Sequence, residues 1–121
     1  DLGNYLHQRG WALHNLASLP HISVGGSCAT ATHGSGTSNG NMASALLGFE
    51  LLIPSGDIIW VDKENNSELF YCSGVSMGAL GVITKIKLAV EPTYNVSQLV
   101  YENLPMDALK EKKLSRCSIG R

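Results

Sequence analysis

Apolar residues recur every three or four positions over residues 2–16, at Leu2, Leu6, Leu13 and Leu16. This spacing places their side chains on one stripe of an α-helix, so the pattern predicts a helix across the segment. Two glycines inside the segment lower its helix propensity, and a proline that follows shortly afterwards marks its end.

A β-hairpin is expected where two β-prone runs, 49–53 and 58–61, flank the polar residues 54–57. Proline, serine, glycine and aspartate are typical turn residues, and a loop of this length commonly joins two antiparallel strands. We therefore expect the two runs to pair in antiparallel orientation.

A further strand is predicted at 82–90, where apolar and polar side chains alternate and Pro92 follows. Because successive side chains of a strand point to opposite faces, the alternation separates an apolar face from a charged one. The apolar face would hold Val82, Thr84, Ile86, Leu88 and Val90, and Lys85 and Lys87 would point the other way.

The remaining segments give weaker patterns. Asn41 is a candidate N-cap for a short helix over 42–47, residues 94–101 are typical of another strand, and Pro105 opens a short charged helix over 106–114. A short helix and a strand both fit residues 68–72. The mixture of helices with antiparallel strands predicts an α+β fold.

The composition is that of a folded, weakly charged chain. Its 121 residues suffice for one domain or part of one, and the 44% apolar and 16% charged content excludes a disordered segment. A net charge of −1 leaves no basic surplus for nucleic acid, and no apolar run approaches the ~18 residues of a membrane span. Three cysteines without a CxxC pair favour reduced thiols in a cytoplasmic protein.

Residues 23–41 differ from the rest of the chain, because five glycines are interspersed there mainly with serine, threonine, alanine and asparagine. Glycines let the backbone approach a ligand closely, and successive N–H groups in such turns form a nest for an anion such as a pyrophosphate. Neither the P-loop pattern nor GxGxxG is present. The segment predicts a ligand-cradling loop in which His33 either bonds a phosphate or pins the loop, and Cys28 is a packing residue.

Two other groups of residues, a serine-hydrolase pattern and a set of three histidines, suggest catalysis or metal binding, but the rest of the sequence excludes both. Residues 74–78 match the GxSxG pattern of serine hydrolases, but all four histidines precede Ser76 and a β-pattern follows where the nucleophile elbow requires a helix. His7, His14 and His21 are seven residues apart, a spacing of about 10.5 Å on a helix, which excludes a shared metal ion. We interpret these three histidines as surface or capping residues.

Two motifs together resemble a known family. Residues 19–26 read LPHISVGG and residues 29–36 read ATATHGSG, with Ala31 where the family usually has glycine. Residues 78–84, GALGVIT, are similar to a second segment of the same family. The chain thus resembles the FAD-linked oxidases of the vanillyl-alcohol-oxidase type, most of all the alditol (xylitol) oxidases, with the sugar-lactone oxidases close by.

The resemblance implies the second lobe of a PCMH-type FAD-binding domain, in which helices flank an antiparallel sheet. Residues 1–105 would form this partial domain, and residues 106–121 would begin a C-terminal substrate domain. Because the chain begins with Asp1 inside a periodic segment, we also expect it to be incomplete. The catalytic groups and the other part of the flavin site would then lie in the missing segments.

The resemblance also assigns roles to residues. Ser23 would lie near both the flavin and the substrate, and Val82 or Ile83 would touch the cofactor through the backbone. The other residues expected to line FAD are Cys28, Ala29, Thr30, Ala31, His33, Gly34, Ser35 and Gly36.

The implied reaction is hydride transfer from a polyol such as xylitol or sorbitol to FAD, followed by reoxidation with O₂ to give H₂O₂. Three alternatives are a sugar-1,4-lactone oxidase, a dehydrogenase of the same superfamily, and a truncated, non-catalytic fragment that binds little FAD. The oligomeric state stays open.

Overall fold

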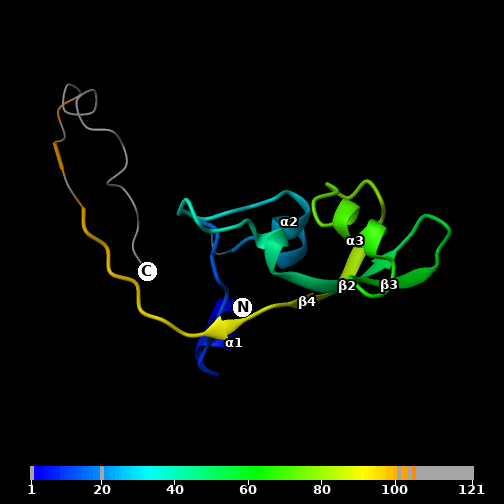
Figure 1. The fold of residues 1–121 in the computed structure, drawn as a ribbon, viewed down its shortest axis with the longest axis horizontal. Coiled ribbons are helices and arrows are strands. Elements are labelled where there is room, and N and C mark those ends of the chain that lie inside the picture. Colours follow the sequence, from blue (N-terminus) through cyan, green and yellow to red (C-terminus); the bar gives the residue numbers. More distant parts are fainter. Residues whose placement is uncertain (1, 20, 101, 104, 106–121) are drawn as a thin grey trace.

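The computed structural model describes residues 2–19, 21–100, 102–103 and 105. The elements, in chain order, are helix α1 (Leu2–His7), strand β1 (Trp11–Ala12), helix α2 (Val24–Ala29), the short helix η1 (Met42–Ala45), strands β2 (Leu46–Leu52) and β3 (Ile58–Asp62), helix α3 (Ser67–Ser73), and strands β4 (Val82–Leu88) and β5 (Glu91–Pro92). In Figure 1, α1 lies towards one end of the folded part, and α3 lies with β2 and β3 at the other.

The main sheet of the fold has three antiparallel strands, with β2 between β3 and β4. The predicted hairpin is confirmed, because β2 and β3 pair from Gly48↔Asp62 to Leu52↔Ile58. Gly56 adopts a φ of +92° in the turn and donates its N–H to the carbonyl of Ile53 at 2.9 Å. This conformation favours glycine, which explains why the turn signal in the sequence was reliable.

Strand β4 is confirmed over Val82–Leu88. Its predicted faces hold for Ile86 and Leu88 against Lys85 and Lys87, but they are wrong before residue 85. Glu50 of β2 pairs with Lys85 while its neighbour Leu51 pairs with Ile83, so Thr84 is the extra residue of a β-bulge. The bulge reverses the alternation, so that Ile83 packs against the core and Val82 is 61% exposed. A simple period of two cannot anticipate an inserted residue.

The hydrophobic core lies where the sheet meets α2, η1 and α3. Phe49 of β2 is fully buried, and its ring stacks on Phe70 of α3 with 6.1 Å between the ring centroids. The other members of this core are Leu13, Cys28, Met42, Leu46, Leu51 and Val61. Residues from both the glycine-rich segment and the hairpin therefore share one core.

The predicted N-terminal helix is confirmed only for its first residues, because α1 ends at His7. Gly10 has a φ of +74° and turns the chain into β1, which pairs with β5. The carbonyl of Gly10 then accepts a hydrogen bond from the N–H of Thr93 at 2.8 Å. Leu13 fits the helical period, but it directly follows strand β1, and its side chain is buried there. The pairing of β1 with β5 has therefore overridden the local helical pattern.

Asn41 caps η1 as expected, and its Oδ1 accepts from the N–H of Ser44 at 3.1 Å. The helix ends at Ala45 rather than at residue 47, because Leu46 already begins β2. Residues 68–72, for which both a helix and a strand were possible, belong to helix α3.

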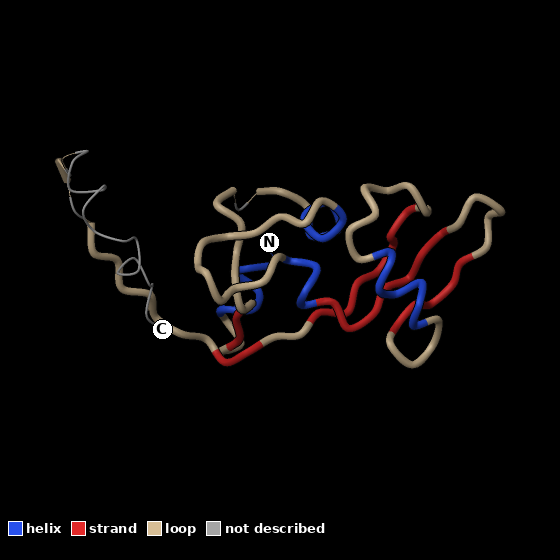
Figure 2. Tube along the Cα trace, turned by 45° about the horizontal axis from the view of Figure 1, so that its top comes forward, coloured by secondary structure: helices blue, strands red, loops and turns tan. Residues whose placement is uncertain are grey.

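The strand expected at 94–101 does not form over residues 94–100. Figure 2 shows the chain beyond β5 running away from the other helices and strands, and among the described residues no strand pairs with it. The helix expected at 106–114 lies outside the described residues. The predicted α+β class, with helices and an antiparallel sheet, is confirmed.

Candidate functional site

The glycine-rich motif begins as a helix and not as a loop, which corrects the expectation for residues 24–29. Ser23 is the N-cap of α2, because its Oγ accepts from the N–H of Gly26 at 3.1 Å. Ser27 Oγ donates to the carbonyl of Ser23 at 2.7 Å, and both Ser27 and Cys28 are buried. Capping and burial therefore offset the low helix propensity of the two glycines.

Ala31 ends α2 in the left-handed conformation, with a φ of +54°. Its N–H donates to the carbonyl of Cys28, and the N–H of Thr32 donates to that of Ser27 at 2.9 Å. This pair of bonds is the Schellman motif, in which glycine usually occupies the left-handed position. Ala31 thus keeps the backbone conformation that its family counterpart, glycine, takes more easily.

We expect Ala31→Gly to raise the free energy of unfolding by ~0.5–1 kcal/mol. The left-handed conformation costs an L-residue roughly 1–2 kcal/mol, and the larger entropy of glycine in the unfolded chain cancels about 0.4–1 kcal/mol of that gain. Urea unfolding of both proteins measures the difference. Ala29→Gly, within the helix, is the matched control and should destabilise by about 0.5–1 kcal/mol. Equal losses for the two variants would contradict the prediction.

The loop after Ala31 is closed at its base, where the N–H of Met42 donates to the carbonyl of Thr32 at 2.7 Å. Among the described residues, none of the backbone N–H groups of 33–40 donates to a protein acceptor. His33 is exposed, and its Nδ1 lies 2.8 Å from the carbonyl oxygen of Gly34. An exposed loop with free N–H groups fits an anionic group such as the pyrophosphate of FAD.

The residues that flank the second motif contact the first motif in space. The N–H of Met77, in the turn before β4, donates to the carbonyl of Ala29 at the end of α2 over 3.0 Å. Strand β4 also contacts α2, because a Cβ added at Gly25 would lie 3.9 Å from Ile86 Cδ1. The same arrangement excludes a nucleophile elbow at Ser76, since helix α3 precedes it and a turn and a strand follow.

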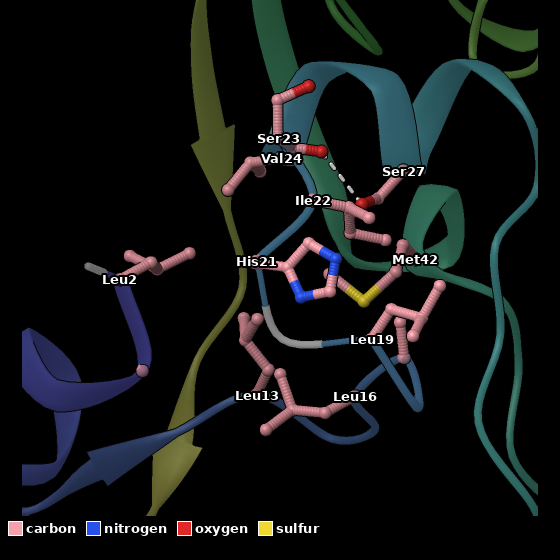
Figure 3. Close-up of a pocket in the computed structure, with 12 residues that line it drawn as sticks. Leu2, Leu13, Leu16, Leu19, His21, Ile22, Ser23, Val24, Ser27 and Met42 are labelled. Atoms are coloured by element: carbon pink, nitrogen blue, oxygen red, sulfur yellow. Dashed lines mark hydrogen bonds between the residues drawn. The ribbon is translucent and has the colours of Figure 1, made fainter.

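A cavity of about 340 Å³ opens beside the N-terminus of α2 (Figure 3). Most of its lining is apolar and includes Leu13, Leu16 and Met42. Ser23 and His21 both lie on its wall. His21 is exposed, as expected for a surface residue, but its place on the cavity wall beside Met42 of η1 was not expected from the sequence.

The electrostatics of the described residues give no sign of a reactive nucleophile or a metal centre. Burial raises the pKa of the Cys28 thiol, and the residue has no exposed surface, which agrees with the packing role expected for it. Hydrogen bonds from Lys85 and then Thr84 lower the pKa of Glu50, on the sheet. No cluster of three or more histidine, cysteine or acidic side chains suited to a metal occurs in this part of the chain.

The other acidic group with a shifted pKa, Asp62, caps the turn after β3. The backbone N–H of Asn65 and the indole of Trp60 lower the pKa of this carboxyl. Within the part of the chain that the structure describes, no helix has the length and apolar character that crossing a membrane requires.

Comparison with known proteins gives a family model described as an FAD binding domain, which matches residues 1–62. The chain is 41% identical over 109 residues to an alditol oxidase from Streptomyces sp., and the match covers 90% of this chain and 26% of that protein. It is 36% identical over 96 residues to a D-arabinono-1,4-lactone oxidase from Eremothecium gossypii, covering 79% of this chain and 18% of the relative. An L-gulonolactone oxidase from Bos taurus is 28% identical over 90% of this chain and 25% of its own length.

The fold is similar to that of 6-hydroxy-D-nicotine oxidase from Arthrobacter nicotinovorans. The TM-score is 0.70 at 22% sequence identity, and the match covers 76% of this chain and 20% of that chain. The chain therefore spans about a quarter or less of the length of the proteins that it matches.

Proposed function

Because the chain belongs to the FAD-binding domain family of flavin-dependent oxidases, we propose that it is the FAD-binding portion of an enzyme that oxidises polyols with O₂. The observation on which the proposal rests is that the turn leading into the second motif is bonded to Ala29 of the first motif, at the end of α2. This contact supports the base of the adjacent loop, whose N–H groups are free. The proposal assigns residues 1–105 to the FAD-binding domain and 106–121 to the start of a substrate domain.

FAD, when bound, supplies the hydride acceptor and the group that O₂ reoxidises. In our proposal, the backbone of 33–36, together with that of residues 28–31, holds the cofactor. Val82 or Ile83 contacts the cofactor through the backbone, because the Ile83 side chain is packed against the core. The proposal also places Ser23 near the substrate, since the residue lines the cavity and its hydroxyl can still donate its proton while accepting from Gly26.

The substrate class is proposed from the relatives, with a polyol first and a sugar-1,4-lactone second. The alditol oxidase is 41% identical and the Eremothecium lactone oxidase 36% identical. A dehydrogenase of the same superfamily and a fragment that binds little FAD are the other candidates. The cytoplasm is the proposed location, on the cysteine content alone.

We expect the oxidase that contains this chain to oxidise xylitol or sorbitol with one H₂O₂ formed per O₂ consumed, and to oxidise a sugar-1,4-lactone more slowly. An oxygen electrode and a coupled peroxide assay measure the two rates, with a sample lacking substrate as control. Faster oxidation of the lactone would favour the second candidate. Turnover that requires an artificial electron acceptor in place of O₂ would favour the dehydrogenase.

A separate titration tests whether the 121-residue chain holds the cofactor by itself. We expect the flavin fluorescence of FAD to change saturably as the chain is added, because the loop and α2 form one connected unit. A chain that leaves the fluorescence unchanged at millimolar concentration would support the fragment alternative.

A further inference from the structure

Only one of the two polar atoms of the Asn15 carboxamide is hydrogen-bonded in this structure. Its Oδ1 accepts from the N–H of Leu16 at 3.1 Å. Its Nδ2 is buried and has no hydrogen-bond partner among the described residues. A buried donor without an acceptor loses its hydration and gains nothing in return, so such groups are rare and call for an explanation.

Asn15 lies directly against the predicted cofactor loop. A Cβ added at Gly34 would overlap the Oδ1 of Asn15 and the carbonyl oxygen of Leu16, and it would lie 3.0 Å from the Cγ of Asn15. The loop backbone therefore passes over the carboxamide at a distance that only glycine permits. Because Nδ2 is enclosed, a ligand in solvent does not reach it, whereas the loop packs on the same carboxamide and carries carbonyl groups that can accept.

The present conformation of the loop is held by bonds that are easily exchanged with water. The carbonyl of Ser35 accepts from the exposed Nδ2 of Asn39 at 2.9 Å, and the carbonyl of Gly34 lies beside the exposed imidazole of His33. Exposed bonds of this kind contribute little net free energy. A ligand that engages the free N–H groups of the loop can thus shift its backbone at low cost.

We propose that Asn15 is a positioning residue for the cofactor loop. When the phosphates of FAD bind the N–H groups of 33–36, the loop settles so that one of its carbonyl groups accepts from Asn15 Nδ2. This inference rests on the proposed function. The bond exists only in the FAD-bound form, so Asn15 favours binding without stabilising the free protein.

The test compares Asn15→Leu, a variant of similar size without the donor, with the unsubstituted 121-residue chain. We expect the affinity for FAD to fall about tenfold, which corresponds to ~1.4 kcal/mol. The free energy of unfolding without FAD should stay nearly unchanged, because removal of the unpaired buried donor offsets the loss of the exposed bond from the Leu16 N–H to Oδ1. Asn15→Ala is measured alongside, since it removes the same donor without adding branched bulk.

Asn39→Ala is the matched control. It removes a loop-contacting amide whose donor is already paired in the FAD-free conformation, so the affinity for FAD should stay unchanged or rise slightly. Hydrogen exchange gives a second readout. In the unsubstituted chain FAD should protect the amides of 33–36, and in both Asn15 variants that protection should be largely lost.

Unchanged FAD affinity in both Asn15 variants would overturn the inference. So would an equal loss of stability with and without FAD, because that result describes a purely structural residue. Failure of the unsubstituted chain to bind FAD is a different outcome, since it contradicts the proposed cofactor role of this chain and, with it, the inference.

Discussion

Gly81→Ala is expected to lower the free energy of unfolding by about 3 kcal/mol. Gly81 has a φ of +147°, a conformation that is nearly restricted to glycine and costs other residues ~1–3 kcal/mol. An added Cβ would also overlap the carbonyl oxygen of Leu52 and lie 3.3 Å from the Cα of Ile53. These are backbone atoms of the hairpin, which cannot move aside as a flexible side chain would, so overlap adds roughly another 1–3 kcal/mol.

Gly56→Ala separates the two contributions to this loss. Gly56 also has a positive φ, of +92°, but a Cβ there meets no atom within 4 Å. We expect about 1–2 kcal/mol for this control, from the conformation alone. Urea unfolding of both variants measures the difference, and equal losses would show that the close approach of Gly81 to β2 contributes nothing.

The same substitution should also weaken the candidate site. Gly81 ends the turn that contains Met77, and the N–H of Met77 is bonded to the carbonyl of Ala29. Displacing this turn from the hairpin would move the support of α2. FAD affinity should therefore fall for Gly81→Ala and stay unchanged for Gly56→Ala, whose turn is at the tip of the hairpin.

Phe49→Ala is expected to cost about 3–5 kcal/mol, the range typical of large buried aromatic residues. Phe49 has no exposed surface and stacks on Phe70 at 6.1 Å, so the substitution removes both its burial and an aromatic pair. Because the total stability of a domain is about 5–15 kcal/mol, this loss should lower the urea midpoint by roughly a fifth or more of its original value.

Leu47→Ala is the control for Phe49→Ala. Leu47 belongs to the same strand, β2, but its side chain is 42% exposed. We expect a loss within about 0.5 kcal/mol, the usual range for surface positions. A comparable loss at both positions would mean that the core does not lie on the face of β2 that carries Phe49.

Short-range signals in the sequence determined the hairpin, the cap at Asn41, the position of β4 and the motifs that identify the family. Each depends on a few neighbouring residues, such as a glycine that can take a positive φ at position 56 or an asparagine whose side chain reaches Ser44. These preferences act within one turn of backbone. A sequence therefore reveals them without knowledge of the rest of the fold.

The tertiary structure decided the features that depend on distant partners. Helix α1 stops at His7 because β1 pairs with β5, and the faces of β4 reverse because Thr84 bulges opposite β2. The predicted cofactor loop lies against Asn15, and Met77, just before the second motif, is bonded to Ala29 of the first. Contacts between residues so far apart in the chain arise from packing and pairing across the whole fold, which no local period or propensity encodes.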